Sequence, residues 1–239
     1  EPVAIGLHQE ARPGIEFFIL GVPTGEVGAQ QVPGQLLQLH AFHRRIIGRR
    51  PVFLKFFRQG RIADLDWAEV SQARVQGKQP IPLFEELLSA WPDLRINIDP
   101  KGDAAVHPLV EVLRRPGVLD RVCAGSFSGR RLATLRSILG AGLCTSMGPG
   151  EVVRLRLKSL GLPAGKFAAE AAQVPLRHYG LPVIDRRFVE TAHDHGLKVH
   201  VWTINDRATM TRLLDLGVDG IMSDETALLK AVFMEHGLW

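Results

Sequence analysis

From residue 60 to its end, the sequence alternates short apolar runs with stretches of amphipathic helical pattern. The apolar runs are nearly continuous, as expected for parallel strands that are covered on both faces. They fall at 95–98, 122–126, 143–146, 172–174, 198–202 and 220–222. The helical patterns fall at 83–91, 104–114, 128–139, 151–160, 186–195 and 207–216. Strands that alternate with helices form βαβ units, so the sequence predicts an α/β fold with a parallel sheet.

The length and rhythm of the chain favour a barrel. The strand–helix units recur every ~20–30 residues, and a chain of 239 residues suits one (β/α)8 barrel. Apolar runs at 3–7, 15–21 and 51–57 can supply the strands still needed. An open doubly wound sheet is the alternative, and it calls for a Gly-rich phosphate loop after the first strand, which this sequence lacks. We therefore predict a single (β/α)8 TIM barrel over residues 1–239.

Several residues mark the expected helix ends. Asp66 and Asp206 stand at N-cap positions, where a carboxylate oxygen accepts hydrogen bonds from the first turn. Glycines follow the predicted helices at the C′ position, where a positive φ is usual. They are Gly117, Gly140, Gly161, Gly196 and Gly217.

Composition indicates the class of protein and the compartment in which we expect it. Hydrophobic residues make up 46% and charged residues 23% of the chain, which is typical of a globular domain. No apolar run approaches the roughly 20 residues that span a bilayer, and residues 1–30 lack the pattern of a signal peptide. Cys123 and Cys144 lie in apolar runs, and we expect free thiols rather than a disulfide. These features predict a cytoplasmic protein without a transmembrane segment.

The net charge of +4 is unevenly distributed. Residues 27–63 contain no acidic residue, and the rest of the chain is net acidic. The basic residues of this segment are Arg44, Arg45, Arg49, Arg50, Lys55, Arg58 and Arg61. Such a block can bind an anion or nucleic acid, but it lacks the interleaved aromatic residues of a recognisable nucleic-acid site. We therefore expect no nucleic-acid partner.

The most informative strand end is the segment from Arg95 to Lys101. Asn97, Asp99 and Lys101 alternate there, so their side chains point to the same side, toward the barrel axis. In such barrels the chemistry lies at the carboxyl ends of the strands. A carboxylate and an ammonium are costly to bury unless each serves the other or a ligand. Asp99 can hold a hard divalent cation and Lys101 can neutralise a phosphate oxygen; a structural ion pair is the alternative.

Other strand ends are expected at the same rim. They are marked by Ser126 with Phe127, Ser146, Trp202 and Ser223. Trp202 would face the mouth as an apolar wall for a glycerol-sized group, and ordinary core packing is the alternative. The prediction is a rim that gathers these residues with Asp99.

Four segments resemble the glycerophosphodiester phosphodiesterase family in its bacterial form. They are "GRIADLDWAEV…IPLFEELL", "INIDPK", "GSFS" and "VHVWTINDRATMTRLLDLGVDGIMSD", and they extend over residues 60–239. The resemblance implies a metal-dependent hydrolase that converts a small-molecule glycerophosphodiester to glycerol 3-phosphate and an alcohol, in lipid and glycerol metabolism. It implies a Ca²⁺ or Mg²⁺ ligand at Asp99, a catalytic and phosphate-binding role for Lys101, and a substrate-binding role for Trp202.

Residues 1–59 depart from the family pattern. The family has a His-Arg-Gly at the end of the first strand, and here His8 is followed by Gln9. A His-Asp follows later in the family, and here His43 is followed by Arg44. The resemblance therefore makes His8 and His43 no more than candidates for the catalytic acid and base.

The expected Glu-x-Asp metal pair is also incomplete. Glu16 matches its first position, but Phe18 stands in place of the aspartate. Two interpretations remain open for residues 1–59: a divergent and inactive relative, or a stretch read in a wrong frame and joined to a normal enzyme sequence.

Two functions follow from these observations. The first is hydrolysis by the family mechanism, in which a glycerol hydroxyl attacks phosphorus and water then opens the cyclic phosphate, with one histidine as base and the other as acid. The second is a catalytically impaired barrel that binds phosphodiesters or a protein partner, because the N-terminal motifs are missing.

Overall fold

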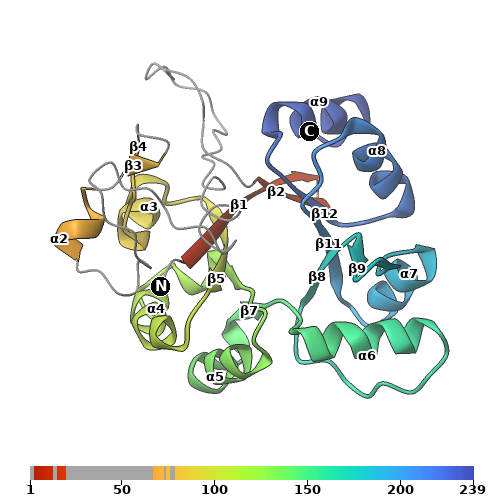
Figure 1. Ribbon diagram of the computed structural model, residues 1–239, viewed down its shortest axis with the longest axis horizontal. Coiled ribbons are helices and arrows are strands. Elements are labelled where there is room, and N and C mark those ends of the chain that lie inside the picture. The colour runs from red at the N-terminus through yellow and green to blue at the C-terminus, as the bar shows by residue number, and fades with distance from the viewer. Residues whose placement is uncertain (1–2, 13–14, 20–66, 73, 76–78) are drawn as a thin grey trace.

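The computed structural model describes residues 3–12, 15–19, 67–72, 74–75 and 79–239. Its main sheet forms a ring of strands at the centre, and helices surround it (Figure 1). In spatial order the strands are β7 (Cys144–Thr145), β6 (Val122–Ala124), β5 (Arg95–Pro100), β1 (Val3–Arg12), β2 (Ile15–Ile19), β12 (Gly220–Ser223), β11 (Lys198–Trp202) and β8 (Ala171–Pro175). A parallel bridge between Ser146 and Ala171 joins the two ends of this order and closes the ring. The predicted α/β barrel is confirmed.

From α3 (Phe84–Ala90) onward, helices alternate with the strands of the main sheet. The helices that follow are α4 (Val106–Leu113), α5 (Gly129–Leu139), α6 (Pro149–Ser159), α7 (Arg186–Asp194), α8 (Arg207–Leu216) and α9 (Thr226–Glu235). Strand residues that face outward pack against these helices. Ile96 and Ile98 of β5 belong to one buried cluster with Leu109 of α4, and Val199 and Val201 of β11 belong to another with Phe188 of α7. Since successive strand residues face opposite sides, the residues between them face the inside of the ring.

The N-terminal strands depart from the expected all-parallel order. β2 runs parallel to β12, but β1 runs antiparallel to both β2 and β5. The reason is the short connection between Arg12 and Ile15. It has no room for the crossover that a parallel pair requires, whereas a hairpin needs only a tight turn. The predicted strand at 51–57 and the predicted N-cap Asp66 lie outside the described residues.

The predicted helix ends are found where the structure describes them. Asp206 caps α8, because its Oδ1 accepts a hydrogen bond of 2.8 Å from the backbone N–H of Thr209. Gly217 ends the same helix with φ 89°, in the left-handed region. Gly140, Gly161 and Gly196 also have positive φ at the ends of their helices. Gly117 has a positive φ as well, but it lies four residues after Leu113, where α4 ends.

Some elements were not predicted from the sequence. They include α9, the pair β3 (Arg74–Val75) and β4 (Gln79–Pro80), and a hairpin of β9 (Arg177–His178) and β10 (Leu181–Pro182). The hairpin follows directly on the carboxyl end of β8 and forms a separate two-stranded sheet. The short helix α2 (Trp67–Val70) begins directly after the predicted N-cap Asp66.

Candidate active site at the carboxyl rim

A polar layer crosses the inside of the barrel beneath the rim. Asn97 of β5 and Gln173 of β8 exchange two amide hydrogen bonds, of 3.1 and 3.2 Å. Gln173 Nε2 also lies 3.3 Å from Nδ1 of His200, which is 2% exposed. Gly125 leaves room for this layer, because a Cβ there would meet Gln173 Oε1 at 3.1 Å. The layer therefore forms a polar floor under the carboxyl ends of β5, β8 and β11.

Asp99 and Lys101 stand above this floor at the end of β5. Their side chains form an ion pair and are 17% and 15% exposed. The other carboxylate oxygen, Oδ1 of Asp99, is buried and has no hydrogen-bond partner among the described residues. A buried, bare carboxylate oxygen is costly. A ligand that enters the rim can therefore bind this oxygen.

An aromatic pair lies beside Lys101. The Lys101 ammonium is 5.4 Å from the centroid of the Phe127 ring. Phe127 in turn makes an edge-to-face contact with Trp202, at 5.6 Å between ring centroids. Phe127 is 60% exposed, and Trp202 packs against Met222 of β12. This chain of contacts places Asp99, Lys101, Phe127 and Trp202 at one end of the barrel, as the sequence predicted for its strand ends.

A hydrogen-bonded corner supports the wall behind Trp202. Asn205 Oδ1 accepts bonds from the Asp224 backbone N–H at 2.9 Å and from Ser223 Oγ at 3.2 Å. Asn205 Nδ2 donates to Asp224 Oδ2 at 3.0 Å. Asn205 and Asp224, which both lie in the last of the segments behind the family resemblance, thus tie the chain after β11 to the chain after β12.

The structure does not bring His8 to this rim. In the antiparallel ladder Ala4 lies opposite Asp99, whereas His8 lies opposite Arg95 at the amino end of β5. Four residues of strand separate the two positions, which is about 13 Å. The N-terminal hairpin thus places the backbone of His8 away from the carboxyl ends that carry Asp99.

The other N-terminal candidates are placed only in part. Glu16 of β2 pairs with Glu10 of β1, and it precedes Phe18, which is level with Met222. The backbone of Glu16 therefore lies below the rim. His43 lies outside the described residues.

Among the described residues of the rim, Asp99 has a buried carboxylate oxygen without a hydrogen-bond partner. Hard cations such as Ca²⁺ take six or more oxygen ligands, and Asp99 Oδ1 suits one of these positions. Among the residues that the structure describes, no group of three histidine, cysteine or carboxylate side chains is arranged to hold a metal ion. The described residues therefore do not form a complete cation site.

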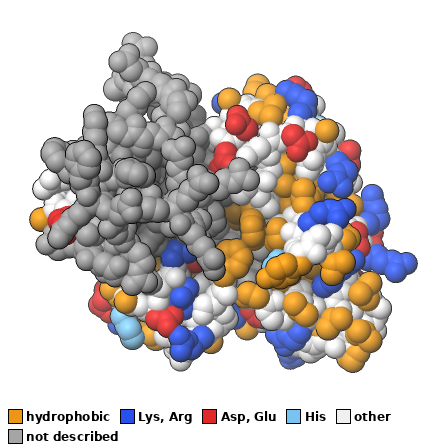
Figure 2. Space-filling model, in the orientation of Figure 1, with side chains coloured by type: hydrophobic (Ala, Val, Ile, Leu, Met, Phe, Trp, Pro, Cys, Tyr) orange, Lys and Arg blue, Asp and Glu red, His pale blue; other side chains and the backbone are white. Residues whose placement is uncertain are grey.

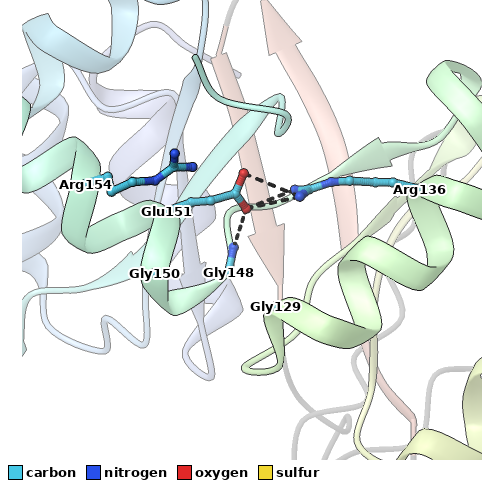
Figure 3. A pocket seen from close by; sticks show the side chains of 6 residues that line it. All are labelled: Gly129, Arg136, Gly148, Gly150, Glu151 and Arg154. Atoms are coloured by element: carbon cyan, nitrogen blue, oxygen red, sulfur yellow. Dashed lines mark hydrogen bonds and ion pairs between the residues drawn. The ribbon is translucent and has the colours of Figure 1, made fainter. Parts of the chain in front are cut away.

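A hollow of about 400 Å³ lies between α5 and α6 (Figure 3). Arg136 reaches into it from α5 and binds Glu151 of α6, at 3.2 Å. Glu151 also accepts a bond of 3.0 Å from the backbone N–H of Gly148, at the start of α6. The two side chains form an ion pair that joins α5 to α6 across this hollow.

Comparison with known proteins identifies the family of this barrel. The glycerophosphoryl diester phosphodiesterase family matches residues 40–228. A probable glycerophosphodiester phosphodiesterase 2 of Mycobacterium tuberculosis is 37% identical over 185 residues, which cover 75% of this chain and 70% of the relative.

The chain belongs to the glycerophosphoryl diester phosphodiesterase family. Enzymes of this family hydrolyse glycerophosphodiesters, as the sequence motifs predicted. The match begins at residue 40, ahead of the break that the motifs suggested at residue 60. It therefore includes His43 and excludes His8.

Solved structures of phosphodiesterases share the fold. A putative glycerophosphodiester phosphodiesterase of Galdieria sulphuraria is 24% identical, with a TM-score of 0.59 and 75% of each chain covered. A phosphodiesterase of Oleispira antarctica, in complex with the product sn-glycerol-3-phosphate, is 20% identical, with a TM-score of 0.57 and 74% of each chain covered. A glycerophosphodiester phosphodiesterase of Agrobacterium tumefaciens is 16% identical, with a TM-score of 0.59, over 95% of this chain and 84% of that chain. At these identities the likeness concerns the fold alone.

In the part of the chain that the structure describes, no helix has the length and apolarity needed to cross a bilayer.

Proposed function

We propose that this chain forms a single barrel domain and hydrolyses a small glycerophosphodiester to glycerol 3-phosphate and an alcohol, with Ca²⁺ or Mg²⁺ as cofactor. The observation that carries the proposal is the bare Asp99 Oδ1 beside Lys101 at the carboxyl rim. The glycerol 3-phosphate bound to the Oleispira antarctica relative supports the proposed product.

Lys101 is proposed to bind the phosphate. Its ammonium lies at the rim, held between the Asp99 carboxylate and the Phe127 ring. A phosphodiester oxygen that enters the rim meets this positive charge in a partly buried setting, where charge pairing is stronger than in water. Charge that develops on the phosphate during the reaction is stabilised by the same ammonium.

Trp202 is proposed to bind the glycerol part of the substrate, together with Phe127. The two rings contact each other edge to face, and Phe127 lies next to Lys101. The carbon atoms of a glycerol group can lie on these rings while its phosphate lies on the ammonium. The exposed Phe127 ring is available for such a contact.

Asp99 is proposed as a metal ligand. A bound divalent cation would supply positive charge to the phosphate. Asp99 offers Oδ1 for it, while its second oxygen stays paired with Lys101. The remaining ligands have to come from water, from substrate, or from residues beyond those that the structure describes.

His8 and His43 remain the predicted acid–base pair. The role rests on the family resemblance, in which one histidine takes the hydroxyl proton and the other protonates the leaving alcohol. The ladder that pairs His8 with Arg95 argues against His8. The catalytically impaired barrel that binds phosphodiesters or a protein partner is therefore the second candidate, and the antiparallel β1 is the observation that favours it.

A hydrolysis assay with glycerophosphocholine separates these two functions. We expect release of glycerol 3-phosphate in the presence of Ca²⁺ or Mg²⁺ and its loss after addition of EDTA. An unchanged rate in EDTA would exclude the metal dependence. Binding of glycerol 3-phosphate without turnover under any of these conditions would instead support the impaired barrel.

A further inference from the structure

Lys101 lies on a very short link between two ordered elements. β5 ends at Pro100, and a 3-10 turn begins at Asp103 and extends to Ala105. Only Lys101 and Gly102 lie between them. The position of the Lys101 ammonium therefore depends on how firmly Pro100 and Asp103 are held.

One side chain holds both ends of this link. Arg131 donates from Nη1 to the carbonyl oxygen of Pro100 at 3.2 Å and from Nε to Oδ1 of Asp103 at 2.8 Å. The Arg131 side chain is 21% exposed. Its planar guanidinium offers several donors in a fixed geometry, which suits it to bind two groups at once.

The base of Arg131 is itself fixed. Arg131 lies in the first turn of α5, and its backbone N–H donates to Oγ of the N-cap Ser128 at 3.4 Å. Phe127, which contacts Lys101, immediately precedes this cap. The same helix start thus carries both the aromatic neighbour of Lys101 and the side chain that holds the link.

Asp103 is the charged partner in this arrangement. The hydrogen bond from Arg131 is the main cause that lowers the pKa of Asp103 below its usual value. Asp103 therefore carries its negative charge at neutral pH and remains an acceptor for Arg131.

We infer that Arg131 is a positioning residue for Lys101: it holds Pro100 and Asp103 and so fixes the Lys101 ammonium at the rim. The catalytic consequence of this inference rests on the proposed phosphodiesterase function. The hold of Arg131 on Pro100 and Asp103 does not depend on that function, since these contacts exist in the protein without substrate.

Arg130 provides a matched control. It carries the same charge, is adjacent in sequence and also binds Asp103, but its side chain is 78% exposed. Among the described residues it binds Asp103 without reaching Pro100. Arg130→Ala therefore removes an arginine and its ion pair with Asp103. It leaves the bonds from Arg131 to Pro100 and Asp103 in place.

The kinetic test uses glycerophosphocholine and a double-mutant cycle. We expect Arg131→Ala to lower kcat/KM about tenfold, because small displacements of a catalytic group are costly. Arg130→Ala should change kcat/KM less than about twofold.

Arg131→Lys keeps the charge but cannot make both hydrogen bonds in the same geometry, so it should not restore the rate. In a Lys101→Ala background, Arg131→Ala should cause no further loss, because the two residues act as one unit. Additive losses, or equal losses in both arginine variants, would overturn the inference.

Amide hydrogen exchange tests whether Arg131 holds the link between Pro100 and Asp103, and this test does not require enzymatic turnover. Arg131→Ala should speed exchange in the peptide covering residues 100–106, and Arg130→Ala should leave it near the wild-type rate. If the wild type shows no turnover, the proposed function fails, whereas the exchange result still decides the role of Arg131. Unchanged exchange in Arg131→Ala would refute the inference even in an active enzyme.

Discussion

Lys101 is the single residue on which the proposed chemistry depends most. Its ion pair with Asp99 was one of two alternatives drawn from the sequence, and the structure contains that pair. The ion pair is compatible with a role of Asp99 as a metal ligand, because Asp99 keeps a second oxygen that has no partner among the described residues. The phosphate-binding role of Lys101 stays a prediction.

Removal of Lys101 should affect turnover far more than stability. We expect Lys101→Ala to lower kcat about 100-fold or more, as for the loss of a charge-stabilising donor, and to shift Tm by only a few degrees. Activity assays and thermal unfolding measure the two effects. A large fall in Tm that the double variant Asp99→Asn/Lys101→Ala reverses would mark the pair as purely structural.

Asp185 provides a pH-dependent contribution to stability. Its carboxylate binds Arg156 at 2.7 Å and caps α7 through the Phe188 N–H at 2.9 Å. The hydrogen bond from Arg156 is the main cause that lowers the pKa of Asp185 in the folded protein. A depressed folded pKa gives stability that is complete above the unfolded pKa of about 3.9 and is lost as pH falls through the folded value.

Asp185→Asn tests this contribution, since asparagine keeps the capping oxygen and removes the charge. We expect a loss of about 0.5–1 kcal/mol at pH 7, because the pair is partly exposed, and a difference from wild type that closes below about pH 4. Unfolding by urea across this pH range measures it. Arg156→Gln should give the same profile, and a difference from wild type that persists at the lowest pH would contradict the assignment.

The sequence predicts some site residues and not others. Asp99, Lys101 and Trp202 stand out because they end apolar strands. Gln173 does not, although it joins Asn97 across the barrel, because the two residues are separated by 76 positions in the sequence. Their pairing depends on the curvature of the closed ring, which no local pattern encodes.

At the scale of elements, helix ends are the best predicted features, and they can be tested. Gly217 has φ 89°, and the space that a Cβ would occupy there is open. Gly217→Ala should therefore destabilise by about 1 kcal/mol through backbone strain alone. Gly150→Ala is the control, because Gly150 also has open space but lies inside α6 without a positive φ. Thermal unfolding should show a lower Tm for the first variant and an equal or slightly higher Tm for the second.

The predicted strands and helices from residue 83 to residue 216 lie within about two residues of those in the structure, which is the usual error at element ends. The parallel direction predicted for β1 was wrong, because an apolar run does not reveal which neighbour a strand pairs with or in which direction. The β9–β10 hairpin was missed because each of its strands has only two residues.

At the scale of the whole molecule, charge around the rim limits metal binding. Asp99 is already paired with Lys101, and the described residues offer no group of three ligand side chains. We expect this chain to bind Ca²⁺ or Mg²⁺ more weakly than about 1 mM. Titration calorimetry measures this affinity, and Asp99→Asn is the control that removes the matched ligand. Tight binding, or metal-dependent turnover near that of an intact relative, would mean that residues 1–59 complete the site.

The surface of the molecule also has an apolar side. Val153, Leu157, Leu160 and Leu162 are exposed on and after α6, where apolar side chains gather in Figure 2. On its other side α6 is buried: Leu155 packs in a cluster with residues of α7 and of the strands.

The barrel has a seam. β7 contains only Cys144 and Thr145, and a single bridge joins its end to β8. The Glu170 carboxylate accepts bonds from the Thr145 N–H at 2.7 Å and from Thr145 Oγ1 at 3.2 Å, so a side chain replaces part of the missing ladder. Fewer backbone hydrogen bonds hold this joint than hold β8 to β11, so opening the ring here costs less. The Glu170 carboxylate therefore contributes to holding the ring closed at β7.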